Sequence, residues 1–146
     1  RLCMVAYRPQ THSYPSQQAR NLGIIIDCKP DMYAQVNAIS MSCFHTLRML
    51  RKIYKSITNN TRKTVTQALI TSKLDYGNAL YAGITKQLTK RLQTIQNAAA
   101  RLVLNLPCLS HITPHLRELL WLPIHKRAQF KLLTHIYKRL HNTGPA

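Results

Sequence analysis

The segment from Asp31 to Ile57 repeats apolar residues at steps of three and four, and this spacing constrains the fold more than any other feature. The apolar positions are Met32, Val36, Ile39, Cys43, Leu47, Leu50, Tyr54 and Ile57. Steps of this size place side chains on one face of an α-helix. We therefore expect a long amphipathic helix here, with the Asp31 carboxylate accepting free backbone N–H groups at its start.

The last two turns of this helix are strongly basic. Arg48, Arg51, Lys52 and Lys55 gather there, and no acidic residue lies among them. A solvated helix surface would also carry such residues, but acids that could offset the charge are scarce in the whole chain. We therefore treat these four side chains as candidate phosphate contacts.

The chain is strongly basic, with 21 Lys and Arg residues against 4 Asp and Glu residues and a net charge of +17 over 146 residues. Such a surface favours polyanions because binding releases counterions from phosphates. Nucleic acid is the leading partner and an anionic membrane surface is the alternative. No apolar run approaches the roughly 20 residues of a membrane-spanning helix, and no signal peptide is recognisable. We expect an intracellular protein and, because the chain begins with Arg1, a piece of a longer one.

The N-terminal residues predict a small β element. The apolar run LCMVAY (2–7) and the β-branched run NLGIIID (21–27) are typical of strands, and RPQTHSYPSQQ (8–18) between them is typical of a loop. The two strands are expected to pair as a hairpin across that loop. The three consecutive isoleucines of the second strand suit a strand that is covered on both faces, so we expect exposed apolar surface if that covering is absent.

Four further helices are expected after the first. They span Thr61 to about Tyr81, Lys86 to about Leu106, Thr113 to about Trp121, and about Pro123 to His141. Their expected buried residues are Val65, Leu69, Tyr76 and Leu80; Leu88, Leu92, Ile95, Ala99, Leu102 and Leu106; and Phe130, Leu133, Tyr137 and Leu140. The sequence thus predicts a mainly α fold, a bundle of about five helices with a small N-terminal β-hairpin, which is α+β by strict count.

Basic residues also line the expected outer sides of the later helices. The complete set of candidate nucleic-acid contacts is Arg48, Arg51, Lys52, Lys55, Lys90, Arg101, Arg127, Lys131 and Lys138. Contacts of this kind recognise charge and shape and do not recognise base sequence. The tyrosines at 54, 76 and 137 fall on expected core faces, so base stacking on them is not expected.

No local motif for catalysis or metal binding is present. The four cysteines, Cys3, Cys28, Cys43 and Cys108, form no CxxC pair, and Cys43 falls on the apolar stripe as a buried thiol. His111 and His115 are four residues apart but lack the glutamate of an HExxH site. Neither a GxSxG turn nor a glycine-rich phosphate loop occurs. We expect no catalytic residue, no metal site, no cofactor and no small-molecule substrate.

Five segments in a fixed order resemble the C-terminal part of the reverse transcriptase of LINE-type (non-LTR) retrotransposons. They are NLGIIID, the helix after it, ALITSKLDYGNALY, RLQTIQNAAARLV and HITPHLRELLWLPIHKRAQFKLLTHIYK, and the similarity runs from about Ala19 to Ala146. The resemblance implies that residues 1–28 are a hairpin at the edge of a polymerase palm. It also implies that residues 29–146 are a helical, thumb-like region resting on the primer–template duplex.

The sequence departs from the whole family protein at the catalytic site. Polymerisation needs carboxylates that hold two metal ions, and in the family these come from palm motifs upstream of the matched region. This chain has no Asp-Asp pair, and its nearest lookalike, Leu74-Asp75-Tyr76-Gly77, has one carboxylate within an expected helix. By this resemblance the parent enzyme would use Mg²⁺ in a palm that this chain lacks, so we expect the chain alone not to be an enzyme.

Two functional hypotheses remain open. In the first, the chain is a piece of a retrotransposon RNA-directed DNA polymerase that keeps non-specific affinity for duplex RNA/DNA or DNA. In the second, it is a non-catalytic remnant or a helical protein-interaction module without a nucleic-acid role. A membrane-surface role ranks third, because it needs a basic amphipathic helix with a free apolar face, and these faces are expected to be used in the core. The sequence does not indicate an oligomeric state.

Overall fold

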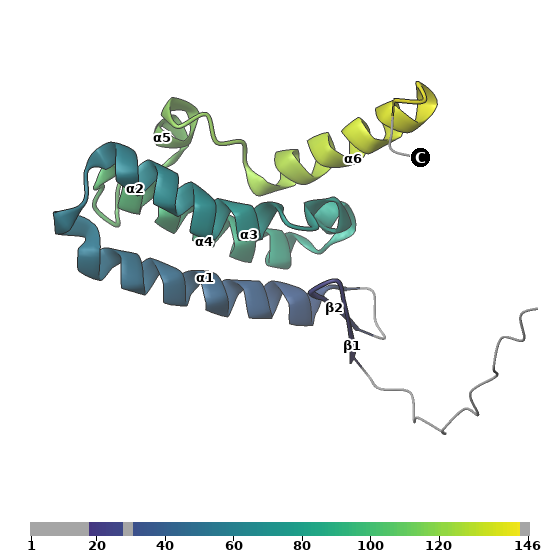
Figure 1. The fold of residues 1–146 in the computed structure, drawn as a ribbon, viewed down its shortest axis with the longest axis horizontal. Coiled ribbons are helices and arrows are strands. Elements are labelled where there is room, and N and C mark those ends of the chain that lie inside the picture. The colour runs from purple at the N-terminus through teal and green to yellow at the C-terminus, as the bar shows by residue number, and fades with distance from the viewer. Residues whose placement is uncertain (1–17, 28–30, 144–146) are drawn as a thin grey trace, which may run out of the picture.

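The computed structural model describes residues 18–27 and 31–143, and the predicted mainly helical fold with a small hairpin is confirmed (Figure 1). The strands are β1 (Gln18–Asn21) and β2 (Ile24–Asp27). The α-helices are α1 (Tyr33–Ile53), α2 (Asn59–Thr66), α3 (Ser72–Asp75), α4 (Lys86–Leu104), α5 (Thr113–Glu118) and α6 (Ile124–Leu140). Three short helical turns join them, namely η1 (Tyr54–Ser56), η2 (Gln67–Thr71) and η3 (Asn78–Gly83).

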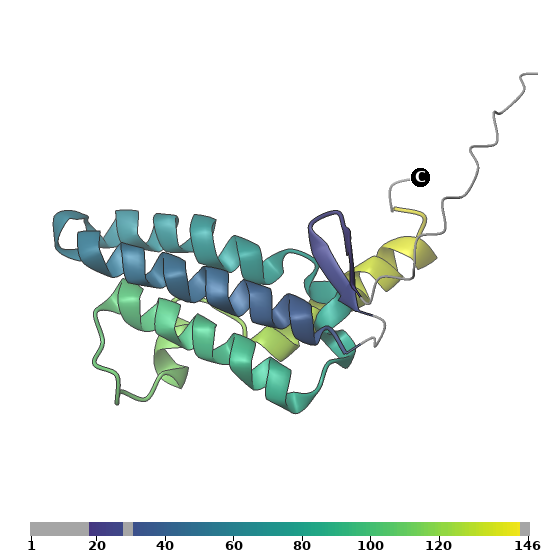
Figure 2. The same ribbon diagram turned by 90° about the horizontal axis from the view of Figure 1, so that it is seen from below.

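Three helical rods lie side by side and form the body of the fold (Figures 1 and 2). They are α1, the continuous run α2–η2–α3, and α4. Arg91 Nη2 donates to Asn37 Oδ1 at 2.7 Å near the starts of α4 and α1, and side chains near the ends of both helices line one hollow. Those two helices therefore run in the same direction. The α2–η2–α3 run is antiparallel to them, and Lys73 Nζ donates to Ser42 Oγ at 2.8 Å.

The apolar stripes predicted for α1 and α4 form the core between the rods. The buried members on these two helices are Val36, Cys43, Leu47, Leu50, Leu88, Leu92, Ile95, Ala99 and Leu102. Asp31 Oδ1 accepts the N–H of Tyr33 at 3.0 Å, so the predicted role of this carboxylate at the start of α1 is confirmed. The helix ends at Ile53, four residues before the expected end, and η1 follows it.

Cys43 is fully buried, whereas Cys108 is exposed. Burial raises the pKa of the Cys43 thiol, and the nearby Lys73 opposes this only in part. Because the thiolate is the reactive form, we expect iodoacetamide to modify Cys108 much faster than Cys43 in the folded protein. Peptide mapping by mass spectrometry after timed labelling would measure both rates. Equal rates before the addition of denaturant would contradict the buried position of Cys43.

The second predicted strand, residues 21–27, is wrong in its extent. The strand partners are Gln18 with Asp27 and Asn21 with Ile24. NLGIIID therefore contains the last residue of β1, a two-residue turn and β2, and Gln18, which was expected in a loop, belongs to β1. The turn residues Leu22 and Gly23 have φ values of 47° and 82°, which suits the two-residue turns that match the twist of a hairpin. The run 2–7 lies outside the described residues. Of the three isoleucines, Ile26 is exposed and the other two are half-buried.

The second predicted helix has a different buried face and a different end. The buried residues on α2, η2 and α3 are Thr66, Ile70, Thr71 and Leu74, while Leu69, Tyr76 and Leu80 are exposed. The buried face passes through Thr66, Ile70 and Leu74 in steps of four, one position after the predicted Val65 and Leu69, and the π-helical turn η2 lies within it. Gly77 has a φ of 67°, and a Cβ atom there would lie 2.8 Å from Ile24 Cδ1. This backbone conformation ends the helical run before the predicted boundary at Tyr81.

The inward face predicted for the last helix is wrong. Phe130, Leu133, Tyr137 and Leu140 are 65%, 64%, 61% and 75% exposed, and α6 instead buries Ile124 and Ala128 near its start. The first turns of α6 pack on η3 and α4, and its C-terminal part extends beyond the other helices (Figures 1 and 2). Of the described residues, none covers this face. The reason given for ranking a membrane-surface role third therefore does not hold for α6.

Candidate nucleic-acid interface

Seven basic side chains gather where α1 ends, α2 begins and α4 ends, and we call this group the basic end. Its members are Arg48, Arg51, Lys52, Lys55, Arg62, Lys63 and Arg101. Five of them are exposed, whereas Arg62 and Arg101 are half-buried. The hairpin-like return of the chain through η1 explains the grouping, because it brings the last turns of α1 next to the first turns of α2. Five of the nine predicted contacts thus belong to the basic end.

Arg51 and Arg101 come from different helices and line a single hollow of about 310 Å³. The hollow is bordered by Tyr54 and by the turn after α4. Arg101 Nη2 donates to the carbonyl oxygen of Ser110 at 3.3 Å, which holds the guanidinium in place. The Nε atom of the same side chain is buried and has no hydrogen-bond partner among the described residues. The guanidinium of Arg101, held by a hydrogen bond, beside the exposed guanidinium of Arg51 suits an anion that enters the hollow.

Sequence analysis missed Arg62 and Lys63, although both belong to the basic end. Thr58 Oγ1 accepts the N–H of Thr61 at 3.3 Å and so caps the start of α2. Arg62 lies over the ring of Tyr54, with its guanidinium carbon 3.8 Å from the ring centre, and its Nη1 donates to Asn59 Oδ1 at 2.7 Å. Lys55 and Arg62 are close in the sequence, and the residues between them are typical of a helix start. This spacing could have indicated that Arg62 and Lys63 lie near the basic end of the first helix.

The charge at the basic end exceeds what the helix ends beneath it can neutralise. The C-termini of α1 and α4 each carry about half a negative charge and the N-terminus of α2 carries about half a positive charge, so together they offset about half a unit, against seven cations. Among the described residues, no acid pairs with any of the seven, because the ion pairs found are Arg127–Asp75 and His115–Glu118. Asp31 and Asp75 lie toward the opposite end of the three rods. The surplus positive charge therefore faces solvent.

The structure does not bring the other four predicted residues to the basic end. Lys90 is exposed near the start of α4, eleven residues and about 16 Å along the helix from Arg101. Arg127 Nη1 donates to Asp75 Oδ1 at 2.7 Å and is half-buried, so an intramolecular partner already satisfies this charge. Lys131 and Lys138 are exposed on α6. The nine residues therefore form three separate groups.

Two aromatic residues that were expected in the core are exposed instead. Tyr76 is 53% exposed and Tyr137 is 61% exposed, so the expectation that both lie in the core is wrong. Neither belongs to the basic end. Tyr76 Oη donates to the carbonyl oxygen of Leu22 and ties α3 to the hairpin. The ring of Tyr137 lies 4.2 Å from that of His141 on the same helix. Tyr54 is half-buried beneath Arg62.

Neither a metal-binding cluster nor a membrane-spanning helix is present in the described part of the chain. Residues 18–27 and 31–143 contain no group of three or more His, Cys, Asp or Glu that could hold a metal ion. None of the helices there is long and apolar enough to cross a membrane.

Comparison with known proteins adds no relative to these observations. No family model matches the chain, and no significant match was found among curated proteins or solved structures. The basic end must therefore be interpreted from its own geometry.

Proposed function

We propose that this chain is a nucleic-acid-binding helical module whose basic end grips the phosphate backbone of a duplex without reading its sequence. The observation that carries the proposal is the gathering of seven cations from α1, η1, α2 and α4 with no acidic partner among the described residues. Five exposed cations provide about five phosphate contacts. Contacts of this type fix a protein on a duplex and carry no base information.

The order of the five sequence segments supports a more specific form of the proposal. By its resemblance to LINE-type reverse transcriptases, the chain would serve as the thumb-like part of an RNA-directed DNA polymerase. The duplex that it holds would then be a primer–template hybrid. In this form the chain positions nucleic acid and supplies no catalytic carboxylate, so the chemistry of nucleotide addition would depend on a palm with its own metal ions.

The functional test is equilibrium binding to labelled duplexes at fixed salt. We expect DNA duplexes and RNA/DNA hybrids of unrelated sequence to bind with dissociation constants within about threefold of each other. A non-specific binder falls at roughly 10⁻⁴ to 10⁻⁶ M at physiological salt. Fluorescence anisotropy would measure the constants, and unlabelled duplex of scrambled sequence would serve as competitor. Absence of binding at millimolar protein would contradict the proposal, as would strong preference for one sequence.

One observation favours the second candidate function, a helical protein-interaction module. The C-terminal half of α6 exposes large apolar side chains that no described residue covers, and a contiguous exposed patch of this kind often marks an interaction surface. Recovery of a protein partner that survives nuclease treatment, together with no affinity for any duplex, would support this candidate instead of the first.

A further inference from the structure

A groove runs along α4 on a side of the molecule that the basic end does not use. Two adjoining cavities of about 710 Å³ and 810 Å³ make up this groove, and they share Gln93, Asn97 and His125 as lining residues. We call the pair the α4 groove. Cavities of this size lie in the range of ligand sites. The α5 helix, the connection to α6 and the start of α6 form its other walls.

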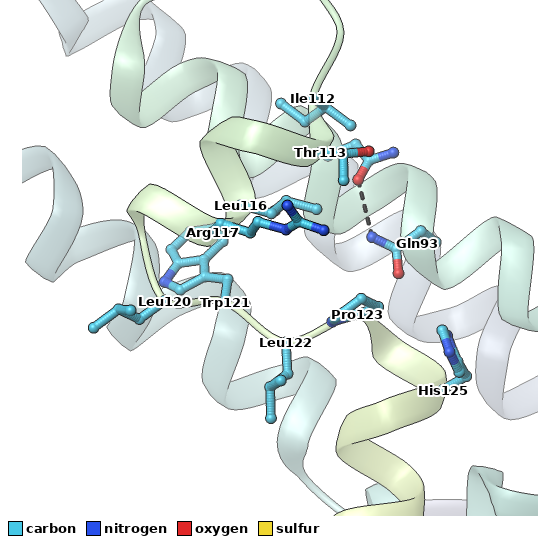
Figure 3. Close-up of a pocket in the computed structure, with 11 residues that line it drawn as sticks. Gln93, Ile112, Thr113, Leu116, Arg117, Leu120, Trp121, Leu122, Pro123 and His125 are labelled. Carbon is cyan, nitrogen blue, oxygen red and sulfur yellow. Dashed lines mark hydrogen bonds between the residues drawn. The ribbon is translucent and has the colours of Figure 1, made fainter.

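One end of the groove is apolar, and Figure 3 shows its walls. The apolar side chains there are Ile112, Leu116, Leu120, Trp121, Leu122 and Pro123. Leu120 and Leu122 are 88% and 50% exposed on either side of Trp121, which is buried. Arg117 extends from α5 across this end toward Gln93 (Figure 3). The apolar end therefore offers room for apolar side chains with a guanidinium beside them.

Leu120 adopts a backbone conformation that a leucine rarely takes. Its φ is 57°, at the position after a helix where glycine is usual. The turn is held by the N–H of Trp121, which donates to the carbonyl oxygen of Leu116 at 2.8 Å. A bulky residue is strained in this conformation, and strain of this kind concentrates at functional sites. The result here is a large apolar side chain held in the open at the edge of the groove.

The other end of the groove is basic and its middle is polar. Lys86 and Lys90 line the end near the start of α4, and no carboxylate lines either cavity among the described residues. In the middle, Gln93 Nε2 donates to Asn97 Oδ1 at 2.9 Å, and Gln93 Oε1 accepts the N–H of Ile124 at 3.0 Å. Asn97 Nδ2 has no partner among the described residues, which leaves a donor for a backbone carbonyl group.

From this arrangement we propose that the α4 groove binds an extended segment of an acidic protein partner. Apolar side chains of the segment enter the α5 end, and its carboxylates lie against Lys86 and Lys90. Lys86 and Asn97 are eleven residues apart, about 16 Å along α4, which about five residues of extended chain would cover. Nucleic acid fits less well, because the large aromatic rings that line the groove, Trp121 and Tyr81, are buried, and His125 is the one exposed ring among its described lining residues, so successive bases have no row of rings to stack on.

The test uses a labelled octapeptide with leucines at one end and glutamates at the other, bound to the whole chain. Two groove variants are Leu120→Ser with Leu122→Ser, and Lys86→Gln with Lys90→Gln. Their matched controls are Leu22→Ser with Leu109→Ser, and Lys131→Gln with Lys138→Gln, all at exposed positions outside the groove. We expect each groove variant to weaken peptide binding about tenfold, the loss expected of an anchor contact, and each control to change it less than twofold. Circular dichroism checks that every variant is folded.

Three outcomes would overturn the proposal. The first is no peptide binding at millimolar concentration. The second is equal binding by an octapeptide of glutamates alone, which would show that charge without an apolar anchor suffices. The third is displacement of the peptide by single-stranded oligothymidine with the same dependence on the groove residues, which would make the occupant a nucleic acid. The basic end is unchanged in all these variants, so its duplex affinity is tested separately.

Discussion

Replacing Arg48, Arg51, Lys52 and Lys55 together by glutamine is expected to weaken duplex binding about a thousandfold at 0.15 M salt. Each phosphate contact makes log affinity fall with log salt at a slope of about −0.9, so four contacts supply about three log units between 1 M and 0.15 M salt. Glutamine keeps the helix propensity of lysine and arginine. Fluorescence anisotropy with a labelled 20-base-pair duplex would measure the loss.

The α6 helix provides a matched control for this variant. Replacing Lys126, Lys131, Lys138 and Arg139 by glutamine also removes four exposed charges, and it likewise takes two of them from the last turn of a helix. The two variants therefore lose the same net charge and the same favourable interactions with a helix dipole. We expect the α6 variant to weaken binding much less. Equal losses would show that binding follows net charge or extends to α6, and would contradict a localised interface.

Removing a core leucine is expected to destabilise the protein severely, whereas removing an α6 leucine that sequence analysis placed in the core is not. Leu92 is fully buried between the rods, and Leu92→Ala should lower the free energy of unfolding by about 2–5 kcal/mol through lost burial and the cavity left behind. Leu133 is 64% exposed, so Leu133→Ala should change that free energy by less than about 0.5 kcal/mol.

Urea unfolding followed by circular dichroism would measure both changes, read from the midpoint at constant slope. Ile95→Ala is a second core variant that guards against an unusual response at one site, since Ile95 is equally buried. A loss of several kcal/mol for Leu133→Ala would mean that another part of the protein or a second copy covers the α6 face, and would contradict the exposure seen here.

The buried helix faces could be predicted from the sequence where the apolar spacing continues without interruption. On α1 and α4 the three- and four-residue steps continue from end to end, so the stripe containing Val36 and Leu47 and the stripe containing Leu92 and Ile95 are the buried faces. The prediction for the run from Thr61 failed because the buried face includes the polar Thr66 together with Ile70 and Leu74, and a pattern of apolar residues alone does not reveal a buried threonine. The face assigned through Leu69 is consequently exposed.

Two further errors have different physical causes. On α6 the apolar face exists as predicted, but periodicity shows only that a face is apolar and does not show what covers it. In the N-terminal segment, two consecutive left-handed residues, Leu22 and Gly23, turned one expected strand into a hairpin. Leucine rarely adopts a left-handed backbone conformation, so of these two residues only the glycine indicated a turn.

The candidate interface was predictable in part. The run from Arg48 to Lys55 and the scarcity of acids indicated four neighbouring cations, of which three lie on α1 and Lys55 lies in η1. Their contact with nucleic acid stays a prediction. Arg62 and Arg101 lie at the basic end because the chain returns through η1 and because α1 and α4 pack in parallel. Both are tertiary features that local sequence does not reveal. For the same reason, the ion pair between Arg127 and Asp75 joins residues 52 positions apart and could not be inferred from local spacing.

The salt dependence of duplex affinity tests the central claim most directly. With five exposed cations at the basic end, log affinity of the native protein should fall with log salt at a slope near −4.5, and a variant in which glutamine replaces only Arg51 and Lys52, so that it still binds measurably, should show a slope near −2.7. Titration from about 0.05 M to 0.3 M salt on one labelled duplex would give both slopes. A flat response of the native protein, or the same steep slope in both proteins, would contradict phosphate binding at the basic end.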